Sequence, residues 1–183
     1  MDNVAVNTHE SLITRCKSGD QQAHFQLYKL YSKAMYNVAF RIAGDEDEAQ
    51  DVLQEAFTSA FRNLHFYRGD ASFGSWLKRI VVNKALNAMQ KRKFDRIPED
   101  DRWDVAEEEI SPEYREELTV DRVKKGILAL PDGYRAVLSL YLLEGYDHQE
   151  IAEIMNISES TSKSQLNRAK TKLREYLTAK VKE

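Results

Sequence analysis

Residues that interrupt helices are scarce in this chain. Its 183 residues include only seven glycines and three prolines, and the intervals between them carry apolar side chains at three- and four-residue steps, the spacing of an amphipathic helix. The interval from Asp20 to Ile42 is a clear example, with Asp20 placed to cap its start and Gly44 placed to end it. No segment clearly predicts a β-strand. The sequence therefore predicts an all-α fold.

The periodicity divides the chain into two helical parts. Helices are predicted over residues 12–17, 20–42, 45–64, 73–91, 120–130, 131–143, 147–155 and 159–179. Between residues 93 and 118 the periodicity weakens, two prolines occur, and eleven acidic residues lie between Asp95 and Glu117, with a short helix expected near Tyr114. We therefore expect two small helical domains, residues 8–92 and 119–180, joined by a flexible acidic linker, residues 93–118.

Charge is distributed in blocks along the chain. The formal net charge of −3 alone argues against a nucleic-acid-binding protein. However, residues 76–93 contain six basic residues and no acids, residues 44–57 contain six acids and no bases, and residues 156–183 contain seven bases and three acids. Such blocks predict that different segments meet different partners.

Several classes of protein are disfavoured by what the sequence lacks. The four histidines and the single Cys16 have no metal-ligand spacing, and no glycine-rich phosphate loop or nucleophile elbow occurs. We therefore expect no metal, cofactor or catalytic residue. No apolar run approaches the roughly 20 residues of a membrane span, and the start of the chain has no apolar signal core. A cytoplasmic protein without membrane insertion is expected.

The most specific local pattern lies between Asp147 and Leu177. It predicts two helices joined by a sharp turn at Asn156, a residue that tolerates the left-handed backbone, with Ser158 capping the second helix. The outer face of that helix combines short hydroxyls with basic and amide side chains, which can contact phosphates and base edges in a major groove. This pattern predicts a DNA-binding helix-turn-helix, although an ordinary solvated basic helix has the same spacing. The face contains Ser160, Thr161, Lys163, Ser164, Asn167, Arg168, Lys170 and Lys172.

The residues around this motif resemble region 4 of bacterial sigma factors of the extracytoplasmic-function (ECF) group. Residues 130–137, LPDGYRAV, are similar to the LP-x-x-x-R-x-V opening of that region, and the similarity continues through the helix-turn-helix. In the family this module binds the promoter −35 element. By position, the resemblance implies DNA contacts from Lys163, Ser164, Gln165, Asn167 and Arg168. Ser160 and Ser162 replace a usual glycine and valine, which leaves the exact set of contacts open and removes one apolar contact.

A second resemblance lies in the N-terminal half. Residues 51–57, DVLQEAF, resemble the D-x-x-Q-E-x-F segment of sigma region 2, which docks on the clamp helices of core RNA polymerase. The resemblance implies core-binding roles for Asp51, Gln54, Glu55 and Phe57. By periodicity, Phe57 also belongs to the buried stripe of its helix. Taken alone, the acids would be explained more simply as stabilising the helix N-terminus.

Residues 66–73 and 76–83 resemble the segment of sigma factors that binds the −10 element. Melted DNA exposes base faces and phosphates, which aromatic and basic side chains recognise, and a glycine-containing loop can form a pocket for a flipped base. For Trp76, packing in the core is an equally good explanation. The candidates for binding the single strand are Tyr67, Arg68, Trp76, Arg79, Asn83 and Asn87.

Together, the resemblances imply an ECF-type sigma factor, which is not an enzyme. Such a protein binds core polymerase and directs promoter-specific initiation, often under the control of an anti-sigma partner. A helix-turn-helix regulator acting without polymerase is the main alternative, and a sigma-like protein that only titrates another factor is a third. In this family the linker threads through the polymerase, where its acids would lie near basic surfaces; a soluble tether explains them equally well.

Overall fold

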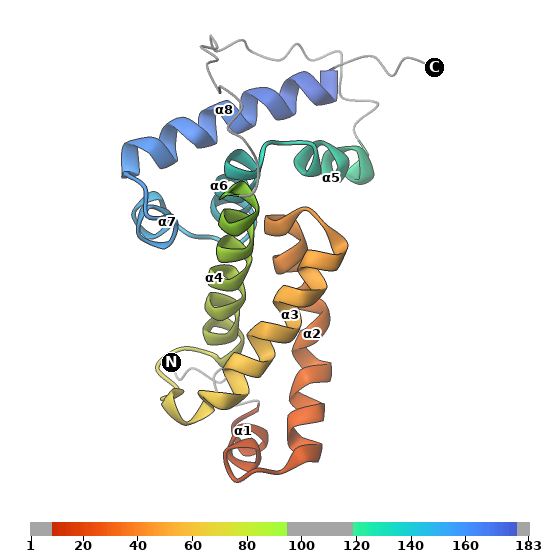
Figure 1. The fold of residues 1–183 in the computed structure, drawn as a ribbon, viewed down its shortest axis with the longest axis vertical. Helices are drawn as coiled ribbons and strands as arrows, with labels where there is room; N and C mark the ends of the chain where they lie inside the picture. The colour runs from red at the N-terminus through yellow and green to blue at the C-terminus, as the bar shows by residue number, and fades with distance from the viewer. Residues whose placement is uncertain (1–8, 95–118, 179–183) are drawn as a thin grey trace, which may run out of the picture. The chain divides into compact units, whose positions relative to one another are not determined.

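The computed structural model describes residues 9–94 and 119–178, and these residues form only helices, turns and loops (Figure 1). The predicted all-α fold is confirmed for them. The greater part of the predicted linker, with the helix expected near Tyr114, lies outside the described residues. The helices are α1 Glu10–Lys17, α2 Gln21–Ala43, α3 Glu46–Arg62, η1 Leu64–Phe66 (a 3₁₀ turn), α4 Phe73–Phe94, α5 Val120–Leu128, α6 Asp132–Leu142, α7 His148–Met155 and α8 Glu159–Thr178.

The chain divides into two compact units, Met1–Gln90 and Lys91–Glu183. In the first unit, α2 and α3 pack against each other across a two-residue turn. Gly44 ends α2 in the left-handed conformation (φ 75°), and the Asp45 carboxylate accepts a hydrogen bond from the backbone N–H of Glu48 to begin α3. The predicted C-cap and the predicted start of the third helix are therefore both confirmed.

The core of the first unit is built from the apolar stripes of its helices. Rings join α2 to α4, because Tyr31 meets Phe73 edge-on with centroids 5.2 Å apart. On the surface, Lys84 of α4 lies 3.4 Å from Glu55 of α3. Completely or almost completely buried side chains come from α2 and α4, and include Leu27, Ile42, Leu77, Val81 and Val82.

In the second unit, α6 is the central helix, and residues 134–140 are buried without interruption. One of them is charged: Arg135, only 4% exposed, donates hydrogen bonds to the Leu130 carbonyl (2.9 Å) and the Asp132 carboxylate (2.8 Å). These bonds satisfy the buried guanidinium and fix the turn that enters α6. Arg135 is thus a structural residue of the LP-x-x-x-R-x-V segment.

The helix α8 packs against α6, α7 and α5. The α5 contact is very close at Gly126, where an added Cβ would lie 2.7 Å from Cδ1 of Leu173 and 2.8 Å from Cδ1 of Tyr176. Glycine therefore lets α5 approach the C-terminal half of α8, which leaves the N-terminal half of α8 to α6 and α7.

Candidate nucleic-acid and polymerase interfaces

The turn between α7 and α8 has the geometry that the sequence predicts. Asp147 and Glu150 form a reciprocal capping box at the start of α7, with N···O distances of 2.8 and 2.9 Å. Asn156 ends α7 in the left-handed conformation (φ 54°, ψ 47°), the only non-glycine residue with positive φ among those described. The Ser158 hydroxyl accepts a hydrogen bond from the Thr161 backbone N–H (3.0 Å) and caps α8. The predicted helix-turn-helix is confirmed as a structure.

A polar contact between buried Ser162 and half-buried His148 joins the two helices of this motif. Ser162 is fully buried, and its hydroxyl lies 2.9 Å from Nδ1 of His148, whose ring stacks on Tyr141 at a centroid distance of 4.5 Å. Serine in place of the usual valine is predicted to remove an apolar contact, and the structure shows that its hydroxyl is hydrogen-bonded to His148. The sequence analysis missed His148; a hydroxyl on the buried stripe is itself a signal, because buried polar groups require partners.

The outer face of α8 presents most of the predicted DNA-contacting residues. Lys163 is held to Glu159 by an exposed ion pair of 2.6 Å. Thr161 is half-buried, and its hydroxyl lies 2.7 Å from that of Ser158. The exposed members of the face are Ser160, Lys163, Ser164, Asn167 and Arg168.

Gln165 differs from the other predicted −35 contacts. Its Oε1 atom is buried beside Gly133 of α6 and has no hydrogen-bond partner among the described residues. The side chain therefore faces the interior of the unit. It lies one helical turn from the inner residues Ser162 and Ala169, which explains this orientation.

The loop between η1 and α4 folds over an aromatic cluster formed by Tyr31, Tyr67, Phe73 and Trp76. Tyr67 is 9% exposed, and its ring lies 5.6 Å from that of Phe73 and 5.3 Å from that of Trp76. Its hydroxyl donates a 2.7 Å hydrogen bond to the Ala71 carbonyl across a turn in which Gly69 has φ 85°. Burial, with contributions from Glu10 and Asp70, raises the pKa of the Tyr67 phenol. Tyr67 thus anchors the loop from within.

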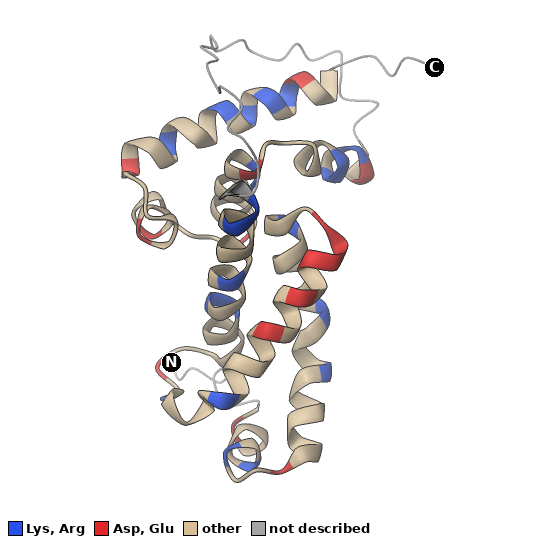
Figure 2. Cartoon of the chain, viewed as in Figure 1, with Lys and Arg blue, Asp and Glu red and all other residues tan. Residues whose placement is uncertain are grey.

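The other residues predicted to bind the single strand are more accessible. Arg68 is exposed in the loop, and Trp76 is half-buried, so it takes part in the aromatic cluster and still reaches the surface. Arg79, Asn83 and Asn87 follow at four-residue steps and are all exposed, which aligns them on one stripe of α4. Basic residues recur along α4 and α8 (Figure 2).

The predicted polymerase-binding residues separate into two groups. Asp51, Gln54 and Glu55 are exposed on α3, where acidic residues gather (Figure 2). Phe57 is only 3% exposed, and its ring packs against Tyr28 at 4.8 Å and Phe61 at 5.7 Å. The structure therefore places Phe57 in the α2–α3 core, as its periodicity predicts, and not on the α3 surface.

Within residues 9–94 and 119–178, no cluster of three or more His, Cys, Asp or Glu residues could hold a metal ion. None of the helices in these same ranges combines the length and apolarity that crossing a bilayer requires.

The fold and these surfaces define a two-unit helical protein with a helix-turn-helix in one unit and an exposed arginine and asparagine stripe in the other. The chain matches Sigma-70 region 2 over residues 27–94 and Sigma-70 region 4 over residues 120–173. It is 31% identical to the ECF RNA polymerase sigma factor SigW of Bacillus subtilis, over 90% of this chain and 94% of that protein. It is 35% identical to the RNA polymerase sigma-H factor of Pseudomonas aeruginosa, over 88% and 89%.

A solved structure has a similar fold: the sigma factor RpoE of Bartonella quintana, in complex with the anti-sigma factor NepR. Its TM-score is 0.56 at 23% identity, covering 85% of this chain and 96% of that one. The chain belongs to the ECF sigma factors of bacterial RNA polymerase. It is a transcription initiation factor that binds core polymerase and promoter DNA. The match to region 2 favours this function over a regulator that acts without polymerase.

Proposed function

We propose that the parts of the chain bind different partners. Residues 8–92 bind core polymerase and the −10 element, residues 119–180 bind the −35 element, and residues 93–118 link the two domains. The observation that carries this proposal is that three helices carry exposed residues of different chemistry: an acidic and amide face on α3, an arginine and asparagine stripe on α4, and a hydroxyl and basic face on α8. Each face has the chemistry of a different partner.

The −35 duplex is read by the outer face of α8. Asn167 and Arg168 contact base edges, since Arg pairs with guanine and Asn with adenine in the major groove. Ser160, Lys163 and Ser164 contact phosphates near the start of the helix, where its backbone N–H groups favour anions. Lys163 exchanges its surface pair with Glu159 for a phosphate, and this exchange costs little because exposed ion pairs are weak. Thr161 and Gln165 position the helix.

The opened −10 strand is bound by the loop and the exposed stripe of α4. Arg68 and Arg79 neutralise phosphates, Asn83 and Asn87 hydrogen-bond to base edges, and the exposed part of Trp76 stacks on a base. Tyr67 supports this surface from below, because its ring is buried and its hydroxyl already closes the loop.

The α3 face binds the clamp helices of core polymerase. Asp51, Gln54 and Glu55 supply exposed acceptors and an amide, and the buried Phe57 fixes α3 on α2. The polymerase supplies all the chemistry, so we assign no catalytic residue, metal or cofactor to this chain. We place the protein in the cytoplasm with its polymerase. The complex of RpoE with NepR supports an anti-sigma factor as a further partner.

Run-off transcription tests this proposal. Purified core polymerase is incubated with the protein and a genomic promoter pool, and transcripts that require the protein are sequenced. We expect transcripts from a limited promoter set sharing two separated motifs. Loss of core binding on replacing Asp51, Gln54 and Glu55 by alanine would support the α3 assignment, whereas wild-type core affinity in that variant would contradict it.

A further inference from the structure

The loop between η1 and α4 is held by a residue of α1, which is distant in the sequence but adjacent in space. Lys17, the last residue of α1, donates a 2.8 Å hydrogen bond from Nζ to the Tyr67 carbonyl, fifty positions away in the sequence. The same ammonium lies 5.7 Å from the centroid of the Tyr67 ring. One side chain thus contacts both the backbone and the ring of the residue that anchors the loop.

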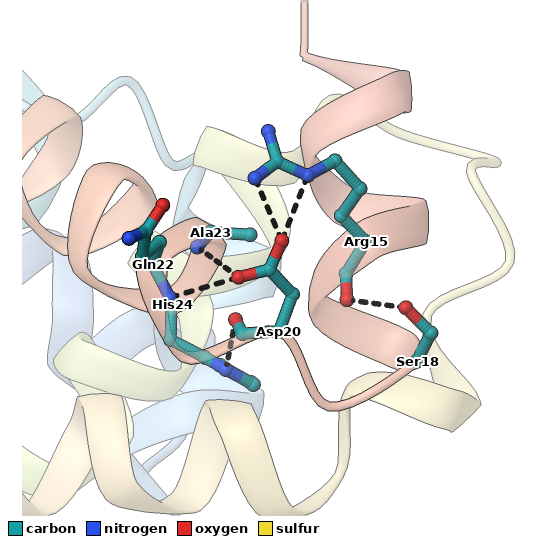
Figure 3. Close-up of polar contacts among 6 residues, drawn as sticks. All are labelled: Arg15, Ser18, Asp20, Gln22, Ala23 and His24. Carbon is teal, nitrogen blue, oxygen red and sulfur yellow. Dashed lines mark hydrogen bonds and ion pairs between the residues drawn. The ribbon is translucent and has the colours of Figure 1, made fainter.

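The position of α1 is itself fixed by its connection to α2 (Figure 3). Oδ2 of Asp20 accepts hydrogen bonds from Nε and Nη2 of Arg15 (2.9 and 2.6 Å), while Oδ1 accepts from the backbone N–H groups of Gln22 and Ala23. Because one carboxylate both caps α2 and holds Arg15, it sets the angle between the two helices. Lys17 follows Arg15 by two residues and therefore projects from a fixed support.

The loop needs such support because it has little regular backbone pairing. Between η1 and α4, the chain turns at Gly69, and the Tyr67–Ala71 hydrogen bond closes the turn from one side only. The Lys17 bond holds the Tyr67 carbonyl at the other side, next to the start of this turn. Fixing a loop in its bound conformation raises affinity, because less conformational entropy is lost on binding.

We propose that Lys17 is a positioning residue for −10 recognition: it holds the Tyr67–Ala71 turn in the conformation that receives the unpaired strand. The inference rests on the proposed role of this loop in binding that strand. Lys17 acts through Tyr67 and does not touch DNA. An ammonium that bound a phosphate directly would be the competing explanation.

The test compares Lys17→Met, which keeps the length of the side chain, with Lys17→Arg, which keeps a donor. Lys33→Met is the matched control, since Lys33 is an exposed lysine on α2 outside the proposed faces. Each full-length protein is assembled with core polymerase, and its affinity for a single-stranded −10 oligonucleotide is measured at several salt concentrations. Hydrogen exchange of residues 64–73 is measured on the DNA-free protein.

We expect K17M to speed exchange in the loop and to weaken single-strand binding about tenfold, the effect of losing one hydrogen bond to a charged group. K17R should recover part of both, and K33M should change neither. The salt dependence of binding should keep its slope, whereas loss of a phosphate contact would reduce the slope by about 0.7.

Three outcomes would overturn the inference: unchanged exchange in K17M, faster exchange with unchanged single-strand affinity, or a reduced salt slope. Failure of the wild-type holoenzyme to bind the oligonucleotide would instead contradict the proposed function of the loop. The exchange measurement on the DNA-free protein still decides whether Lys17 holds the turn.

Discussion

The two surfaces that we propose for binding DNA, the −35 face and the −10 surface, are built in different ways. The −35 face is one side of α8, and its exposed residues are arranged by helical geometry alone. The proposed −10 surface combines a helix stripe with a loop, and that loop contacts α1 and α4. A helix face therefore tolerates changes elsewhere as long as the helix stays packed, whereas the loop is sensitive to residues that are distant in the sequence.

The largest effect is expected from a substitution in the packing beneath the −35 face. Arg135→Ala removes a buried guanidinium and leaves the Asp132 carboxylate and the Leu130 carbonyl without it. We expect the second unit to lose about 2 kcal/mol of stability, the cost of losing hydrogen bonds made by a charged group, because the half-buried Asp132 keeps its 3.0 Å ion pair with Arg92. Hydrogen exchange should rise throughout α6 and α8, and Arg135→Lys should recover only part of the loss.

The effect of Arg135→Ala should be confined to the second unit. Exchange in α2 and α3 should stay at the wild-type rate, because Arg135 contributes to the second unit. Equal loss of protection in both units would show that the two surfaces do not have separate supports.

The next effect concerns the turn of the helix-turn-helix. Asn156→Ala should destabilise the second unit by about 1 kcal/mol, since alanine lacks the local hydrogen bonding that lets asparagine adopt the left-handed region. Asn156→Gly should stay near wild type, because glycine removes the steric cost but adds freedom to the unfolded chain. Urea unfolding of both variants measures the difference, and identical midpoints would contradict the role of the turn.

A smaller effect is expected from the outer face of α8. Arg168→Ala should weaken binding to the −35 duplex about tenfold, the value of one base contact, without changing the stability of the fully exposed helix face. Glu175→Ala, at an exposed position farther along the same helix, is the control. A loss of affinity that is matched by a loss of stability would assign Arg168 a structural role.

The smallest effect is expected from Asp20→Asn, which removes the charge of Asp20 but keeps its capping of α2. Its hydrogen bonds with Arg15 and with the N-terminus of α2 lower the pKa of this carboxyl. The stabilisation is therefore present above the unfolded pKa, about 3.9, and is lost as the pH falls through the folded value. Asp20→Asn keeps a cap but loses the charge, so the difference in Tm between the two proteins should shrink below about pH 4. A constant difference down to pH 2 would contradict the ion pair.

The sequence predicted the features that depend on neighbouring residues. The caps at Asp20 and Ser158, the glycine end of α2 and the left-handed turn at Asn156 are all confirmed, because each is a local property of a few residues. Phe57 shows how two local signals can differ: its helical periodicity predicted burial, while the family motif suggested a surface contact, and the packing follows the periodicity.

The features that the sequence did not predict are one unusual burial and two contacts between residues distant in the chain. The burial of Arg135 is uncommon for its residue type, although two of its partners, the Leu130 carbonyl and the Asp132 carboxylate, lie close to it in the sequence. The helical position of Gln165 places it towards the inner side of α8, but the burial of its Oε1 atom beside Gly133 depends on the packing of α8 on α6. The Lys17–Tyr67 bond spans fifty positions, and no periodicity links those residues.

The central claim is that two separate faces bind duplex and unpaired DNA, and one measurement tests it directly. The holoenzyme is prepared with Asn167 and Arg168 replaced by alanine, or with Arg79 and Asn83 replaced by alanine, and its affinity for a −35 duplex and a −10 single strand is measured. We predict that the first variant loses at least about tenfold affinity for the duplex alone, and the second for the single strand alone. Equal losses for both DNAs in both variants would contradict the claim.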